Sequence, residues 1–334
     1  MSAARKKLTA LIAGALPLLL ACAFISACSS SPDTSAPERT VVNRTADWHG
    51  ALLYVADQNG PDPDWGSVRI YDNVSGFVEK SVEQTLAAAP ADVCVTPDGG
   101  SMFVASGDNG RIEHFHWDGN NWLDGPKIDT PAQSLSALVR GPDGMLYAAA
   151  ADTAAPAGSA ARGGPGLFYR IDPASDSISG APLSFPQLAS ASGIAWSPDG
   201  GTVYVSGRRK GAGAALVVAA WPSARQLALI NLPAAAVNEA VAAPDGRFVY
   251  VMGRGKIVKI DAAARAVAGA LTPAPEPDAE YYGAAFSADG RYLFTDATPP
   301  GADSTLYVID VAGGNTVQTV RHIGVKARGL KRVE

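Results

Sequence analysis

The stretch Ala191–Arg208, ASGIAWSPDGGTVYVSGR, contains the unit from which the fold can be predicted. A short apolar run leads into the turn Pro198-Asp199-Gly200, and the alternating run TVYV leads out of it. Proline presets φ at such a turn, aspartate caps its own turn, and glycine accepts a positive φ. A turn of this kind between two alternating apolar runs predicts a β-hairpin.

Turns of the same kind recur through the chain. They are centred on Asp98, Asp143, Asp199, Asp245 and Asp289, with successive spacings of 45, 56, 46 and 44 residues. Each is followed by a strand-like run such as SMFVAS or FVYVMG, and a second pair of runs usually comes next. Four strands in roughly 45 residues are typical of a β-propeller blade. The longest spacing contains the insert ADTAAPAGSAARGGPG, which has too few apolar residues to form a further blade.

The two ends of the repeat region predict how the ring closes. ALLYVADQNG, which starts at Ala51, matches the second strand of a blade but has no first strand before it. ARGLKRVE, which starts at Ala327, matches a first strand but has nothing after it. Pairing the two would leave no open sheet edge. We therefore predict that residues 48–334 form an all-β domain, a six-bladed β-propeller closed by the C-terminal strand, with a seven-bladed ring as the alternative.

Residues 1–28 have the order of an export signal, and the segment after them reads as a tether. The basic run Arg5–Lys7 precedes the apolar run Leu8–Ile25. The ending ISAC resembles the lipobox of bacterial lipoproteins, which implies that Cys28 becomes the lipidated first residue, carrying acyl chains such as palmitate. Residues 29–47 are polar and rich in Ser, Thr and Pro, which predicts a flexible tether. We expect an extracytoplasmic protein, lipid-anchored on the periplasmic side of the outer membrane or on the cell surface.

Two alternatives to this anchor stay open at the sequence level. LLAC at Cys22 is a second lipobox candidate, and residues 1–28 could be an ordinary signal peptide or an uncleaved anchor. Cys94 lies in the apolar run ADVCVTP, which predicts a small buried core residue. With Cys28 acylated, no partner is left for a disulfide.

Charge and motif content narrow the classes of function. The net charge is −5, whereas binding of nucleic acid needs clustered Lys and Arg. The sequence contains no Gly-x-Ser-x-Gly, no His-Glu-x-x-His, no phosphate-binding loop and no Cys-x-x-Cys. We expect a monomeric propeller that does not bind nucleic acid, and a binding module is favoured over an enzyme.

Alignment of the first strands by their turns predicts where a site would lie. One residue from each blade should form a ring at the channel mouth: Asp92, Ala137, Gly193, Glu239, Gly283 and Gly329. Asp92 and Glu239 come from blades three apart, so they should face each other across the axis as like charges. The residues just outside the ring are Ser136, Ser192, Asn238, Tyr282 and Arg328. These positions predict a site for a small polar ligand or for a divalent cation such as Ca²⁺ or Zn²⁺, formed by Asp92, Asn238, Glu239, Tyr282 and Arg328. The alternative is a hydrated channel lined with polar residues.

Weaker candidates lie elsewhere. His114 and His116 are two apart on one strand and share a face, so a third ligand would complete a metal site. The loop DQNGPDPDWG, which starts at Asp57 and includes Trp65, spaces oxygen atoms like a calcium loop but departs from the EF-hand pattern. The segment TPAPEPDAEYY, which ends at Tyr282, should make the long-loop face acidic and partly aromatic, as a protein-binding surface would be.

Two of these phrases carry a family resemblance. GIAWSPDGGTVYVSG and ADVCVTPDGGSMFVASGDNGRIEHF resemble the YVTN/lactonase-like and NHL-type β-propellers of bacteria, over nearly all of residues 48–334. WSPDG is also similar to the propeller of the bacterial Tol system, a periplasmic protein–protein adaptor. The resemblance implies a module that binds an envelope protein or a small ligand.

The same resemblance supplies the enzymatic alternative. Gluconolactonase-like propellers hold a divalent metal centrally with Glu, Asn and Asp side chains. Glu239, Asn238 and Asp296 would be the counterparts here. The alternative function is therefore a metal-dependent hydrolase of the lactonase type.

Overall fold

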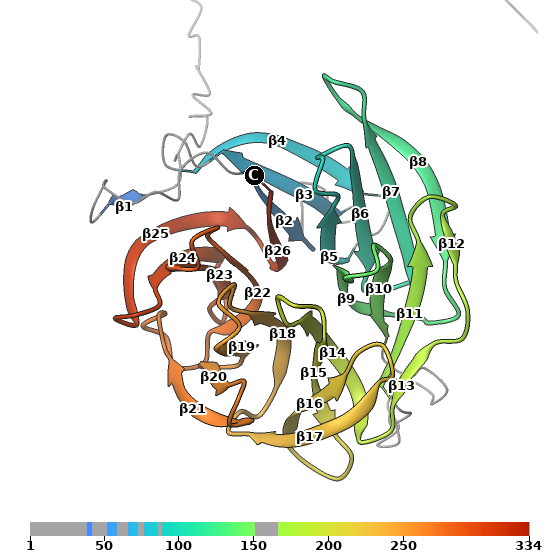
Figure 1. Cartoon of the computed structure of the whole chain (residues 1–334). Helices are drawn as coiled ribbons and strands as arrows, with labels where there is room; N and C mark the ends of the chain where they lie inside the picture. The colour runs from blue at the N-terminus through green and yellow to red at the C-terminus, as the bar shows by residue number, and fades with distance from the viewer. Residues whose placement is uncertain are drawn as a thin grey trace, which may run out of the picture. The chain divides into compact units, whose positions relative to one another are not determined.

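The chain folds into six antiparallel sheets that surround a central axis (Figure 1). The computed structural model describes residues 39–41, 52–58, 66–72, 77–85, 89–150 and 166–333. Over these residues every helix or strand element is a β-strand. In this part of the chain no helix is long and apolar enough to cross a membrane.

Each sheet is one blade, numbered here in chain order. Blade 1 consists of β26 (Ala327–Val333), β2 (Leu52–Asp57), β3 (Gly66–Asp72) and β4 (Val78–Thr85). Blade 2 consists of β5 (Pro90–Val95), β6 (Ser101–Ser106), β7 (Arg111–Trp117) and β8 (Trp122–Asp129). Blade 3 consists of β9 (Leu135–Arg140), β10 (Leu146–Ala150) and β11 (Gly166–Asp172), with β12 (Ser177–Ile178) and β13 (Leu183–Phe185) sharing the outer position.

The second half of the ring is more regular. Blade 4 consists of β14 (Leu188–Trp196), β15 (Thr202–Arg209), β16 (Ala214–Ala220) and β17 (Arg225–Leu232). Blade 5 consists of β18 (Val237–Ala242), β19 (Phe248–Gly253), β20 (Ile257–Asp261) and β21 (Ala266–Leu271). Blade 6 consists of β22 (Glu280–Phe286), β23 (Tyr292–Thr298), β24 (Ser304–Asp310) and β25 (Asn315–Gly324), with β1 (Arg39–Val41) outside β25. The prediction of six blades is confirmed, and the seven-bladed alternative is not what the structure shows.

The Pro-Asp-Gly turns join the first and second strands of their blades, as predicted. In blade 2, Asp98 Oδ1 accepts hydrogen bonds from the Gly100 amide at 3.1 Å and the Thr96 hydroxyl at 2.6 Å. Gly99 between them has φ 69°, a conformation that costs other residues energy. The turn chemistry read from the sequence is therefore the chemistry that forms the hairpins.

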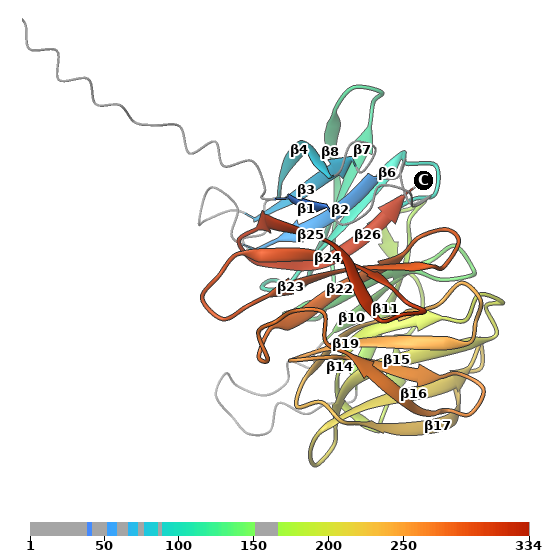
Figure 2. The same ribbon diagram turned by 90° about the vertical axis from the view of Figure 1, so that its left-hand side faces the viewer.

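The ring closes as the sequence predicts. β26 pairs antiparallel with β2, from Leu52 opposite Val333 to Asp57 opposite Ala327. The last strand of the chain thus becomes the innermost strand of blade 1, so neither terminal blade is left with an unpaired inner edge. At this junction β22 and β23 of blade 6 pack against β26 of blade 1, and β25 contacts β2, as the neighbouring labels in Figure 2 show.

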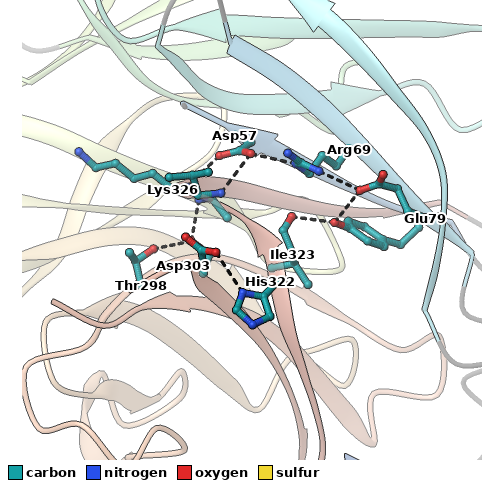
Figure 3. Close-up of polar contacts among 12 residues, drawn as sticks. Asp57, Arg69, Glu79, Thr298, Asp303, His322, Ile323 and Lys326 are labelled. Atoms are coloured by element: carbon teal, nitrogen blue, oxygen red, sulfur yellow. Dashed lines mark hydrogen bonds and ion pairs between the residues drawn. The ribbon is translucent and has the colours of Figure 1, made fainter. Parts of the chain in front are cut away.

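A buried carboxylate fixes the junction. Asp57 accepts hydrogen bonds from the backbone amides of Val325 and Lys326, at 3.2 and 2.9 Å, and from Arg69 Nε at 2.9 Å (Figure 3). Tyr71 donates its hydroxyl to the Ile323 carbonyl at 2.8 Å. The chain is thereby held where it passes from blade 6 to blade 1. Hydrogen bonds to a charged group contribute roughly 1.5–3 kcal/mol each.

Large apolar side chains fill the spaces between blades. Aromatic pairs bridge neighbouring blades, as in Phe77 with Phe294 at 6.2 Å between ring centroids and Tyr147 with Trp196 at 4.9 Å. Cys94 is buried in this packing, as predicted, and burial raises the pKa of its thiol to about 12. A thiol in this environment stays protonated and inert.

Several sequence predictions lie outside the described residues. These are the export signal with Cys22 and Cys28, the insert 151–165, and most of the loop after Asp57, including Trp65. Within the predicted tether, Arg39–Val41 forms β1 and pairs with β25, Arg39 opposite Val320. The rest of residues 29–47 is likewise outside the described part.

Candidate functional site

The six ring positions meet around the channel because glycine stands at three of them. A Cβ built on Gly193 would lie 2.6 Å from Glu239 Cα, and one on Gly283 would lie 2.3 Å from the Leu330 amide nitrogen. A Cβ on Gly329 would lie 2.8 Å from Asp92 Cα. Such distances are too short for any real side chain, so glycine is what lets neighbouring inner strands approach closely.

Asp92 and Glu239 join their own blades to the next. Asp92 Oδ2 accepts a hydrogen bond of 2.7 Å from the amide of Leu138, the residue after the ring position of blade 3. Glu239 Oε2 accepts one of 3.0 Å from the amide of Ala284, which occupies the same register in blade 6. Asp92 Oδ1 also accepts from the Val93 amide at 2.8 Å. The two carboxylates therefore perform the same structural role in opposite halves of the ring.

Lys331 lies between the two carboxylates. Its Nζ is 3.4 Å from Asp92 Oδ2 and contacts Glu239 Oε1 directly. The prediction that Asp92 and Glu239 face each other as bare like charges is therefore wrong, because a cation from the closing strand separates them. Sequence reasoning missed Lys331, although it lies two residues after the ring position Gly329 and hence on the same strand face.

Burial controls the charge of this Asp92–Glu239–Lys331 triad. Burial raises the pKa of Asp92, and it raises that of Glu239 to about 8, while the charge of Lys331 opposes both shifts. Burial lowers the pKa of Lys331, but the two carboxylates outweigh that effect and raise it overall.

A cavity of about 190 Å³ opens above the triad. All five predicted site residues line it, so the structure does bring them to one place. They share it with Gln58 of blade 1 and with Ser134, Ser136 and Ser192. Ligand binding at this set stays a prediction.

Two of the lining side chains are partly used by the fold. The Ser136 hydroxyl donates to the Ala191 carbonyl at 3.1 Å, and the Asn238 amide donates to the Tyr281 carbonyl at 2.7 Å. Both bonds join neighbouring blades. Tyr281 is itself fully buried, so it is not part of an exposed aromatic surface as the sequence suggested.

Arg328 differs from every other charge at this mouth. Its Cζ lies 3.8 Å from the centroid of the Tyr282 ring, a cation–π geometry that holds the guanidinium in place. Its Nε is buried without a hydrogen-bond partner, and no carboxylate of the described residues forms an ion pair with it. Tyr282 donates its hydroxyl to Glu280. Arg328 is thus a positioned cation that is left available to the cavity.

Each of the three predicted metal ligands, Glu239, Asn238 and Asp296, already has a hydrogen-bond partner within the fold, and metal binding by them stays a prediction. Asp296 Oδ1 accepts from the Gly283 amide at 2.7 Å, its Oδ2 is buried without a partner, and burial raises its pKa to about 7. Glu239 is occupied by Lys331 and Ala284, and Asn238 donates toward Tyr281. Within the described ranges no three His, Cys, Asp or Glu side chains gather as a metal site would require.

The two histidines on β7 do share a face, with 3.9 Å between their ring centroids. His114 Nδ1 lies 2.7 Å from Asp176 Oδ1, which accepts its hydrogen bond, and the imidazole ring stacks on Phe103. Burial lowers the pKa of His114, and its Nε2 has no partner. The described part of the chain brings no third ligand to the pair.

Comparison with solved structures supports the fold. The structure is similar to TolB from Acinetobacter baumannii, with a TM-score of 0.60 at 14% identity over 86% of this chain and 67% of that one. It is similar to a functionally unknown protein from Desulfotomaculum acetoxidans, with a TM-score of 0.57 at 12% identity over 85% and 99%. Hydrazine synthase from Kuenenia stuttgartiensis gives a TM-score of 0.54 at 18% identity over 74% of each chain. No protein-family model and no curated protein matches the sequence.

Proposed function

We propose that this protein is a lipid-anchored, extracytoplasmic binding module that holds a small organic anion at the channel mouth. The observation that carries the proposal is Arg328, a guanidinium positioned over Tyr282 that lines the cavity without an ion-pair partner among the described residues. Arginine binds carboxylates through paired hydrogen bonds, so a carboxylate is the ligand group that suits it.

The state of the carboxylates favours an anion over a cation. Both oxygens of Asp92 and both of Glu239 already accept from a backbone amide or from Lys331. A divalent cation would have to displace these contacts, because hard cations need several free oxygen ligands. An anion needs only the free guanidinium.

The size and polarity of the cavity restrict the ligand further. A volume of about 190 Å³ is below the usual range of about 300–1,000 Å³ for sites that hold drug-sized ligands. Ser192 and Gln58 add hydroxyl and amide groups near the guanidinium. A small hydroxy acid or sugar acid combines a carboxylate with hydroxyl groups on this scale.

The envelope location rests on the N-terminal sequence. The lipobox-like ending at Cys28 and the polar residues 29–47 support a lipid anchor. The resemblance to YVTN/lactonase-like and NHL-type propellers, and the structural likeness to TolB, are compatible with binding in the envelope. Mass spectrometry of the mature N-terminus tests the anchor: Cys28→Ser should remove the lipid and Cys22→Ser should not, and an unmodified terminus beyond Cys28 would contradict it.

A calorimetric screen tests the ligand class. Purified protein is titrated with small hydroxy acids and sugar acids, with their uncharged amides, and with Ca²⁺ and Zn²⁺. We expect binding of at least one acid, no binding of its amide, and loss of binding in Arg328→Ala. Arg225→Ala, an exposed arginine on β17, is the matched control and should bind as the wild type does. Acid binding that survives Arg328→Ala, or tight binding of the cations alone, would contradict the proposal.

A further inference from the structure

A second cavity lies away from the channel, between blades 1 and 2. Its volume is about 510 Å³. Apolar side chains of β2, β3 and β26 line one part of it, and three aromatic residues, Tyr54, Trp117 and Trp122, line another. Lys80 and Asp98 are the charged residues that line it within the described part of the chain. The site described above uses none of these residues.

The three aromatic rings are inclined to one another. Trp117 and Trp122 are cross-strand partners in the β7–β8 hairpin, with 5.4 Å between ring centroids and an interplanar angle of 53°. Trp122 and Tyr54 come from different blades, at 6.3 Å and 82°. Trp117 is 43% exposed, so its ring is accessible to a ligand that enters the cavity. Inclined rings around one cavity are the arrangement of an aromatic cage, which binds cations that carry methyl groups.

The charges at the cavity also favour a cation. The hydrogen bond from Thr96 and that from the Gly100 amide hold the pKa of Asp98 below its ordinary value, so this carboxylate is ionised at neutral pH. Lys80 is balanced by Asp72, with 3.4 Å between Nζ and the carboxylate oxygen. Lys80 is thus engaged by Asp72, and Asp98, which also feels the charge of Arg140, is the one carboxylate among the described residues that line the cavity.

We propose that the cavity between blades 1 and 2 binds a soluble trimethylammonium compound through Tyr54, Trp117, Trp122 and Asp98. A quaternary ammonium has no N–H groups, so it loses no hydrogen bonds when it enters a cavity walled by aromatic and apolar side chains. Its charge is spread over methyl groups that contact ring faces, and cation–π attraction adds to their burial. Asp98 supplies the opposite charge at the rim. An ordinary ammonium ion is more strongly hydrated and binds less well.

Calorimetry and tryptophan fluorescence test the ligand with four probes: choline, tetramethylammonium, ammonium, and 3,3-dimethyl-1-butanol, which is the uncharged isostere of choline. We expect choline and tetramethylammonium to bind and to change the tryptophan emission. The isostere should bind about tenfold more weakly, since it keeps the shape and loses the cation–π attraction. Equal binding of choline and its isostere, or no binding of choline to the folded protein, would overturn the proposal.

Variants locate the binding. Trp117→Leu should weaken choline binding about tenfold or more, Trp117→Phe should retain part of it, and Leu123→Ala, an exposed neighbour, should have no effect. Asp98→Asn should weaken binding severalfold. Its matched control is Asp199→Asn, because Asp199 holds the equivalent turn of blade 4 with the same bonds, from Ser197 and Gly201. Equal loss in both aspartate variants would overturn the role of Asp98.

Two further experiments distinguish this proposal from binding to a membrane and from the proposed anion site. Vesicles of phosphatidylcholine present the trimethylammonium group on a membrane surface. Binding to these vesicles but not to free choline would overturn the proposal that the ligand is soluble. Arg328→Ala should leave choline binding unchanged, because Arg328 lines the other cavity. The failure of one proposal is therefore distinguishable from the failure of the other.

Discussion

Two groups of charges line the channel and are used differently: the buried Asp92–Glu239–Lys331 triad, here called the interior, and Arg328 beside it, here called the mouth. In the interior, Asp92 and Glu239 each accept from a backbone amide of the next blade, and both contact Lys331. At the mouth, Arg328 lies over an aromatic ring and forms no ion pair within the described residues. The interior charges satisfy one another, whereas Arg328 has no such carboxylate partner among the described residues, which is why we propose it as the anion-binding group.

The difference shows how to separate a structural charge from a binding one. A buried charge with a complete set of partners stabilises the arrangement that supplies them, and its removal leaves those partners uncompensated. A positioned charge without an ion-pair partner contributes less to the fold, which makes it the better candidate for ligand binding. Stability should therefore fall when the interior is changed and ligand binding should fall when the mouth is changed.

Removal of the closing strand should have the largest effect. Deletion of residues 327–333 takes away the innermost strand of blade 1, the apolar packing of Leu330 and the only cation between Asp92 and Glu239 among the described residues. Ladder hydrogen bonds contribute about 1 kcal/mol each, so with the packing and the ion pairs the loss is large against the stability of a typical domain, about 5–15 kcal/mol. We expect insoluble protein, measured as the soluble fraction on expression. A soluble truncation with an unchanged melting temperature would show that closure does not depend on β26.

Lys331→Met should cause the second-largest loss of stability. It leaves two buried carboxylates without their cation, and breaking a buried ion pair in this way typically costs about 3–5 kcal/mol. Chemical denaturation should show a loss of that size, while Lys210→Met, on an exposed lysine, should change little. An unchanged unfolding free energy would mean that the triad is not a structural unit.

The double variant Asp92→Asn, Glu239→Gln tests the same ion pairs from the side of the carboxylates. If the two carboxylates repelled each other unpaired, the double variant would be neutral or stabilising. With Lys331 between them, the variant instead leaves a buried ammonium unpaired, so we expect destabilisation comparable to that of Lys331→Met.

The pH dependence of stability should report on Asp296. Its pKa in the fold is about 7 against an ordinary value of 3.8, so the folded state holds this proton more tightly than the unfolded chain does. The stabilisation is complete below pH 3.8 and is lost as the pH rises to about 7, by up to about 4 kcal/mol. Asp296→Asn should flatten this part of the curve, measured by urea unfolding at intervals between pH 4 and pH 8. An identical slope in the variant would show that other groups cause the dependence.

Arg328→Ala should have the smallest effect on stability. It removes the stacking on Tyr282, worth about 0.5–1 kcal/mol at a partly exposed site, and the charge interaction that lowers the pKa of Asp296, but no ion pair among the described residues. Thermal unfolding without ligand should therefore change by only a few degrees, while binding of the anion is lost. A loss of stability as large as that of Lys331→Met would place Arg328 with the interior charges and would remove the distinction between the two regions.

The fold could be predicted from the sequence because its determinants are local. The turn at Asp199 needs only the hydrogen bonds that Ser197 and Gly201 make with it, and the alternation after it sets the strand. Repetition of that unit gave the number of blades, and the two unmatched terminal strands gave the closure. The ring of positions from Asp92 to Gly329 followed from counting residues along each strand.

The tertiary structure alone decided what those positions do. Asp92 and Glu239 were expected to repel each other, yet Lys331 from the far end of the chain lies between them and both bond the next blade. The cavity between blades 1 and 2 likewise depends on Tyr54 and Trp122, which are 68 positions apart and meet only in the folded ring. The physical reason is the same in both cases: turns and strands are fixed by neighbours in the sequence, whereas the charge state and availability of a side chain depend on groups that only the packed blades bring within a few ångströms.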